Sequence, residues 1–194
     1  MSQTREYGET PSAVLVNEHR LIKQVLEVLR ELARLAREED TWEEEALQRC
    51  VSFFQLYADG CHHGKEEDLL FPVMEQRGIA REGGPIGVML FEHQMAREFT
   101  AEMAEALERL ESDAAPAREA FLKAADEYIG LLTHHIYKED FELFPMGDSC
   151  MTEKDQGTLY LRFCDVDCGQ FDGLLREELE QIAAELVARW GQPV

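Results

Sequence analysis

The chain has few basic residues, no regular cysteine framework and no long apolar run, and each shortage excludes a class of protein. Lysine and arginine number 19 against 40 aspartates and glutamates, so the formal net charge is −21. Nucleic acids and anionic membranes select basic surfaces, and we expect neither as a partner. No apolar run approaches the roughly 18 residues of a membrane span, and the polar N-terminus does not resemble a signal peptide. Five cysteines make an odd count without regular spacing, which favours a reducing cytoplasm.

Proline and glycine are also scarce, and apolar residues recur with the period of a helix rather than that of a strand. We therefore predict an all-α fold, in which residues 11–146 form an up-down-up-down four-helix bundle after an N-terminal tail of residues 1–10. Residues 147–194 are predicted to add two further helices packed on the bundle. Thr41 and Glu44 have the spacing of a capping box, which predicts the start of the second helix.

The six histidines fall in four matching places. A lone histidine, His19 or His93, follows a glutamate, and a histidine pair, 62–63 or 134–135, comes about forty residues later. The distance from His19 to His62 is 43 residues, and that from His93 to His135 is 42. Histidines used for packing or surface chemistry would scatter, so the repeat indicates a shared site.

Each histidine pair is followed by a glutamate at helical spacing. Residues four apart share one face of a helix, so His62 with Glu66, and His135 with Glu139, each present an imidazole beside a carboxylate. Burying two such carboxylates without cations would be very costly. Six side chains are therefore the predicted metal ligands: His19, His62, Glu66, His93, His135 and Glu139.

Six donors in this symmetric arrangement suit two metal ions better than one. We assign one ion to His19 and His62 and the other to His93 and His135, with both glutamates bridging, as in two-metal sites about 3.5–4 Å apart. Mixed imidazole and carboxylate ligation with open positions suits non-haem iron. Zinc is the main competitor and manganese a further substitute, because ligand type alone does not separate them.

At the level of motifs the chain resembles a known family. The segments HHGKEEDLLFP (62–72) and HHIYKEDFELFP (134–145), with the Glu-His pairs at 18–19 and 92–93, resemble the hemerythrin-like (HHE cation-binding) domain over roughly residues 11–146. The resemblance implies the same six ligands and an oxo- or hydroxo-bridged pair of iron ions. Oxygen-carrying members place a second histidine four residues after the third-helix ligand, where this chain has Arg97. They also place an aspartate five residues after the fourth-helix histidine, so Asp140 stays an alternative to Glu139.

The resemblance implies a function without settling it. We expect a non-haem diiron protein that binds O₂, peroxide or NO in an oxidative-stress response or in iron handling, with possible redox turnover. The alternative is an iron- or oxygen-responsive sensor or interaction module without turnover, which would have a protein partner.

Several other polar residues lie close to the predicted ligands in the sequence. His63 and His134 are read as flanking residues, although His63 could add a ligand or pair with Glu67 in a shifted register. Glu18 and Glu92 are predicted to face solvent or to support the neighbouring ligands. Tyr128 could donate a hydrogen bond to a bound oxygen species, but core packing is favoured.

The cysteines carry weaker signals than the histidines. Cys61 is expected in the core. Cys150, Cys164 and Cys168 are read as ordinary thiols, because three cysteines without a fourth ligand make a weak zinc motif.

Overall fold

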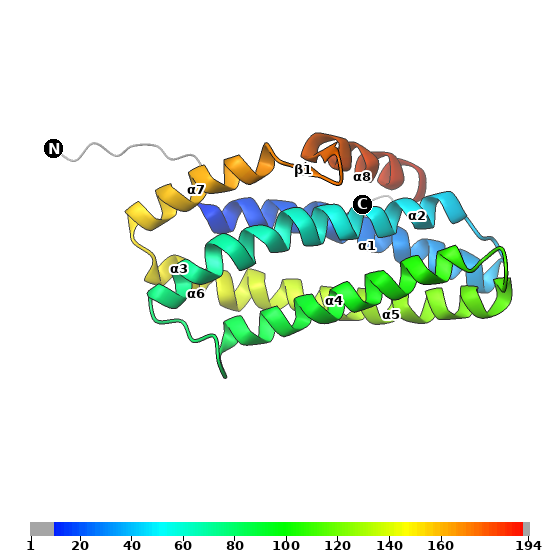
Figure 1. The fold of residues 1–194 in the computed structure, drawn as a ribbon, viewed down its shortest axis with the longest axis horizontal. Helices are drawn as coiled ribbons and strands as arrows, with labels where there is room; N and C mark the ends of the chain where they lie inside the picture. Colours follow the sequence, from blue (N-terminus) through cyan, green and yellow to red (C-terminus); the bar gives the residue numbers. More distant parts are fainter. Residues whose placement is uncertain (1–9, 192–194) are drawn as a thin grey trace.

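The computed structural model describes residues 10–191 and confirms the all-α fold class (Figure 1). Four long helical stretches run up and down beside one another. The first is α1 (Pro11–Glu38) and the third is α4 (Pro85–Glu108). The second is built from α2 (Glu44–Phe53), η1 (Phe54–His63), η2 (Glu66–Leu70) and α3 (Phe71–Gln76). The fourth is built from α5 (Ala114–Lys138), η3 (Glu139–Leu143) and α6 (Phe144–Cys150).

Local sequence explains where most of these helices begin. Pro11 occupies the first turn of α1, and the Thr10 hydroxyl accepts a hydrogen bond from the Ala13 amide at 3.2 Å. The capping box expected at Thr41 is wrong, because α2 begins only at Glu44 and has no side-chain cap. Asp40 turns the chain at a φ of 49°, and Thr41 instead donates to the Glu39 carbonyl at 3.4 Å.

The segments η1, η2 and η3 are π-helical, a wide form of helix that is frequent at functional sites. The Phe71 amide donates to the Glu66 carbonyl and the Phe144 amide to the Glu139 carbonyl, each five residues back. A proline follows each phenylalanine, and inside an α-helix its ring would clash with the carbonyl four residues earlier. The wider turn relieves that clash, so the repeated Phe-Pro accounts for a π-helical stretch in both halves of the chain.

A layer of polar residues divides the interior into two apolar clusters. Along α1, Leu15 belongs to the smaller cluster and Ile22 to the larger, and His19 lies between them. The same order holds on α4, where Met89 and Ala96 flank His93. All four helical stretches therefore contribute apolar residues on both sides of one buried polar layer.

The C-terminal residues form a helix–hairpin–helix extension along one side of the bundle. It consists of α7 (Glu153–Asp167), β1 (Gln170–Phe171), β2 (Leu174–Leu175) and α8 (Arg176–Trp190). Both helices contact α1, and α8 also contacts α2, as the upper side of Figure 1 shows.

The short hairpin between α7 and α8 was not predicted from the sequence. It turns at Asp172 and Gly173, which have φ values of 50° and 83°, the positive angles that an Asp-Gly hairpin turn requires. Among residues 10–191, no helix has both the length and the apolarity to cross a membrane.

Candidate metal centre

The polar layer brings together all six predicted ligands. None of their side chains is more than 1% exposed to solvent. They come from all four helical stretches, and the histidine Nε2 atoms and glutamate oxygens face inward. That these side chains bind a metal stays a prediction.

The first group of donors, which we call position A, contains His19, His62, Glu66 and Glu139. The Nε2 atoms of His19 and His62 lie 3.0 Å apart. Glu139 Oε2 is 3.2 Å from His19 Nε2, and Glu66 Oε1 is 3.7 Å from His62 Nε2. Two imidazoles and two carboxylate oxygens therefore converge on one point.

The second group, position B, contains His63, Glu66, His93 and His135. The Nε2 atoms of His93 and His135 lie 3.1 Å apart, and Glu66 Oε2 is 3.3 Å from His93 Nε2. Glu139 Oε1 lies 3.1 Å from His135 Nε2, so this carboxylate also reaches position B. Glu66 and Glu139 each turn one oxygen toward either position, which is the geometry of a bridging carboxylate.

His63 is the member of position B that the sequence reading left as a flanking residue. It is 2% exposed, and its ring stacks on that of His93 with the centroids 3.8 Å apart. Asp59, four residues earlier, accepts a hydrogen bond from His63 Nδ1 at 3.2 Å. The Asp59–His63 spacing was the available signal, but the second histidine pair has no equivalent, because Leu132 and Ile136 stand there.

A carboxylate holds the outer nitrogen of every histidine in the two positions. Glu18 accepts from His62 Nδ1 at 2.9 Å and Asp140 from His19 Nδ1 at 2.6 Å. On the other side, Glu92 accepts from His135 Nδ1 at 2.9 Å and Glu67 from His93 Nδ1 at 2.7 Å. A carboxylate can only accept, so each Nδ1 carries its proton and each neutral ring keeps an Nε2 lone pair for a metal.

These contacts also show which of the alternative carboxylates face the histidine Nε2 atoms. Asp140 and Glu67 lie behind the histidines as acceptors, whereas Glu139 and Glu66 face the Nε2 atoms. Glu18 and Glu92 accept hydrogen bonds from the predicted ligands His62 and His135 instead of facing solvent, with exposures of 1% and 14%. Arg97, in the place of an additional histidine, pairs with Glu67 at 2.6 Å.

The remaining candidates do not reach the centre. His134 is exposed and donates from Nδ1 to the Gly130 carbonyl at 2.8 Å. Tyr128 packs against Phe54 in the larger apolar cluster. Cys61 is buried, as expected, and Cys164 and Cys168 are exposed free thiols.

The two positions are related by an internal repeat that includes their surroundings. Lys65 donates to Glu18 just as Lys138 donates to Glu92. Phe144 stacks on His19 with centroids 5.6 Å apart, and Phe71 stacks on His93 at 6.0 Å. The repeat therefore extends through ligand, hydrogen-bond partner and packing ring, and His63 is its main departure.

In this layer a proton and a metal cation would compete for the same histidine nitrogens. Burial opposes charge on His19, but its hydrogen bond with Asp140 and the nearby charge of Glu139 outweigh burial and raise its pKa to about 9. Burial and the neighbouring His93 lower the pKa of His63 well below its ordinary value. Burial raises the pKa of Glu18, but His62 and Lys65 outweigh this and bring it down to about 2.

The donor set can be tested for its fit to metal ions. All four carboxylate oxygens of Glu66 and Glu139 are buried without a hydrogen-bond partner within the described residues. Two pairs of Nε2 atoms, whose Nδ1 atoms carry the protons, face each other at 3.0 and 3.1 Å. When the rings are neutral, carboxylates without a hydrogen bond and opposed lone pairs are both costly in a protein interior, and a cation in each position would satisfy them. The residues fit two metal ions.

Comparisons with known proteins agree with this chemistry. Residues 10–147 match the family model of the hemerythrin HHE cation binding domain. Two mycobacterial proteins, uncharacterized protein Rv1995 of Mycobacterium tuberculosis and uncharacterized protein Mb2018 of Mycobacterium bovis, are each 27% identical to this chain over 141 residues, which are 73% of this chain and 54% of the relative. The chain thus matches about half the length of these relatives, and no solved structure matches it. The family model covers most of the chain, including every residue of positions A and B, so the protein belongs to the hemerythrin HHE cation-binding domain family.

Proposed function

We propose that this protein holds two iron ions in positions A and B and uses them to bind a small diatomic or peroxide ligand. The observation that carries the proposal is the set of four unpaired, fully buried oxygens of Glu66 and Glu139 between five imidazoles. Non-haem iron accepts mixed imidazole and carboxylate ligands. Iron held there would supply redox chemistry toward O₂, peroxide or NO, in an oxidative-stress response or in iron handling.

The two positions differ in how much of an ion they would enclose. Position A offers His19 and His62 with two carboxylate oxygens. Position B offers the same two carboxylates and a third imidazole from His63. Position A therefore leaves more of an ion uncovered, and we assign the external ligand to it.

The chain also controls what surrounds such a ligand. Leu15 and Phe144 lie in the smaller apolar cluster on one side of the layer, and Ile22 lies in the larger cluster on the other. These residues keep bulk water away from the site, and in a dry environment the charges of the carboxylates act more strongly. The carboxylates behind the histidines fix the ring orientations, so the Nε2 lone pairs are already aimed before a metal arrives.

An anaerobic Fe²⁺ titration followed by admission of O₂ tests the proposal. We expect saturation at two iron ions per chain, and a change in the near-ultraviolet and visible spectrum when O₂ enters. Spectral change that reverses on removal of O₂ indicates reversible binding, whereas change that persists until a reductant is added indicates redox turnover or sensing. Absence of saturable iron binding would contradict the assignment to iron.

A further inference from the structure

The C-terminal extension contacts the carboxylate that supports position A. Arg176, the first residue of α8, approaches Glu18 Oε1 with Nη1 at 3.2 Å, and the same guanidinium pairs with Asp167 at the end of α7. Asp167 in turn pairs with Lys65, which itself donates to Glu18. Glu18 accepts from His62 Nδ1 at 2.9 Å. A continuous chain of charged contacts thus runs from the extension to a predicted ligand.

The internal repeat provides a comparison for this network. Lys65 and Glu18 are 0% and 1% exposed, whereas their counterparts Lys138 and Glu92 are 30% and 14% exposed. No residue of the described extension pairs with Glu92 or Lys138. The burial of the first pair therefore comes from the extension, since the residue types of the two pairs are the same.

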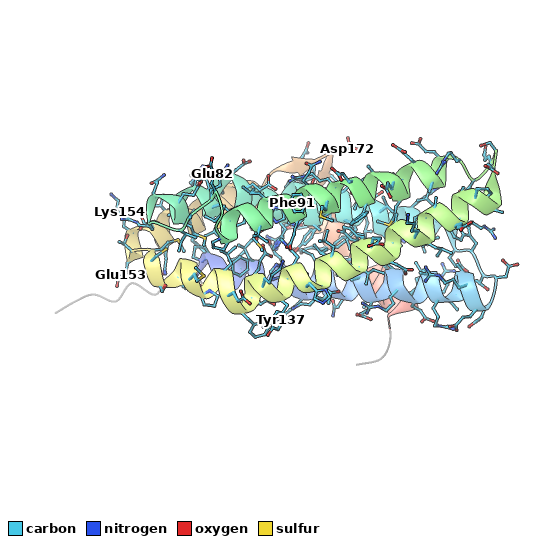
Figure 2. The ribbon with its side chains drawn as sticks, turned by 90° about the horizontal axis from the view of Figure 1, so that it is seen from below. Glu82, Phe91, Tyr137, Glu153, Lys154 and Asp172 are labelled. Atoms are coloured by element: carbon cyan, nitrogen blue, oxygen red, sulfur yellow. The ribbon has the colours of Figure 1, made fainter. Side chains whose placement is uncertain are left out.

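The helix faces beside the two pairs differ in the same way. Val14 and Asn17 on α1 lie beside Tyr160 and Phe163 of α7. On the other half, Phe91 of α4 and Tyr137 of α5 are 66% and 59% exposed. Both are labelled on the helices nearest the viewer in Figure 2. Within residues 10–191, further chain covers the side of position A but leaves Phe91 and Tyr137 exposed.

Burial makes the contacts of this network more effective. A charged pair in solvent contributes little to orientation, because water screens it and competes for its hydrogen bonds. Glu18 receives hydrogen bonds or ion-pair contacts from His62, Lys65 and Arg176 in a nearly dry environment. The aromatic ring of Phe163, with its centroid 5.8 Å from Lys65 Nζ, closes the network on the extension side.

We infer that the C-terminal extension is a positioning element for position A, in which Arg176 and Asp167 lock Glu18 and Lys65 and thereby fix the ring of His62. The inference rests on the proposed function, because it requires metal ions in both positions. It assigns Arg176 and Asp167 to the retention of one ion only. Position B relies on the partly exposed Glu92–Lys138 pair and on its third imidazole.

The test follows the release of Fe²⁺ from the loaded full-length protein to a chromogenic chelator under anaerobic conditions. Arg176→Met keeps the length of the side chain but removes its charge. We expect one of the two ions to leave up to about 10-fold faster, the lower end of the range for loss of a group in direct contact with a ligand, and the other at the wild-type rate. Asp167→Asn should accelerate the same ion, and Arg176→Lys should restore most of its retention.

Arg77→Met is the matched control. Arg77 pairs with Asp155 near the start of α7 at 2.8 Å, so its loss removes one ion pair of the extension that does not involve Glu18 or Lys65. We expect wild-type release of both ions from this variant. If Arg176→Met and Asp167→Asn release both ions at the wild-type rate, or accelerate both ions equally, the inference is wrong. A wild-type protein that never binds two ions would instead refute the proposed function itself.

Discussion

Positions A and B contain the same types of residue but differ in the additional residues that contact them. Each has a lone histidine, a histidine with a glutamate four residues later, a lysine–glutamate pair behind it and a stacked phenylalanine. Position A is completed from outside the bundle, by the charged contacts of the C-terminal extension. Position B is completed from inside, by the extra imidazole of His63. The repeat supplies the predicted ligands of both positions, whereas His63 and the C-terminal extension make the two positions inequivalent.

The strongest disruption should come from the residues that both positions share. Glu66 turns one oxygen toward His62 and the other toward His93, at 3.7 and 3.3 Å. Glu66→Gln keeps the shape but removes the charge, so we expect stoichiometric iron binding to be lost at both positions. Metal analysis of the desalted protein gives the number of ions per chain. Two ions retained in this variant would contradict the bridging role of Glu66.

Replacing His63 should abolish one difference between the positions. His63→Ile installs the residue found at the matching place in the second half, Ile136. We expect weaker binding of one ion, by more than the roughly 10–100-fold that loss of an outer partner costs, because a direct donor is removed. Competition with a chelator of known affinity measures the change. His134→Ala, at an exposed histidine, is the control and should bind both ions normally.

The free energy of unfolding should depend differently on pH in the metal-free and the metal-loaded protein. The pKa of His19 is raised from 6.5 to about 9, so its proton stabilises the metal-free fold below pH 6.5 and this contribution is lost as the pH rises to about 9. We expect the metal-free protein to lose up to about 3 kcal/mol of unfolding free energy over that interval. A metal ion must displace the same proton. As the pH rises, the loaded protein should therefore gain stability relative to the metal-free one. Urea unfolding of both forms at pH 6.5 and 9 checks the sign, and parallel curves would count against a proton on His19.

The smallest effect is expected at the exposed thiols. Cys164 is an exposed free cysteine of α7 that lies near Asp167 and Arg176 without an ion-pairing group of its own. Cys164→Ser should leave iron stoichiometry and the release rates of both ions unchanged. Faster release of the ion in position A would show that the packing of α7, and not only its charges, supports that position.

The sequence predicted the parts of this structure in which inward-facing residues recur every three or four positions along a helix. The four inward-facing series and the histidine spacing depend on residues three and four apart, and the corresponding helices are present. The adjacent pair His62 and His63 shows where that logic fails. On a regular α-helix neighbouring side chains diverge by about 100°, so only one of the two was expected to face the site. The π-helical form of η1 was not predicted, and both histidines are buried.

Contacts between segments that are distant in the chain could not be predicted from the sequence either. Nothing in the residues around Arg176 indicates that it lies 3.2 Å from Glu18, since the two are brought together only by the packing of α8 on α1. Asp172 and Gly173 form a typical turn pair between α7 and α8. The two strands that they connect are only two residues each, which is too short for a periodic pattern to predict them. The acceptor roles of Glu67 and Asp140 likewise depend on the partner helix.

The bridging glutamates have a consequence for the order in which the protein is made. Position A draws on His19 and His62 near the start of the chain, but it also needs Glu139. Position B needs His93 and His135, together with His63 and Glu66 from the first half. Neither half of the chain owns a complete set of donors, although each carries one copy of the repeat. If both positions hold metal ions, we therefore expect the emerging chain to complete them only after about residue 140 has left the ribosome.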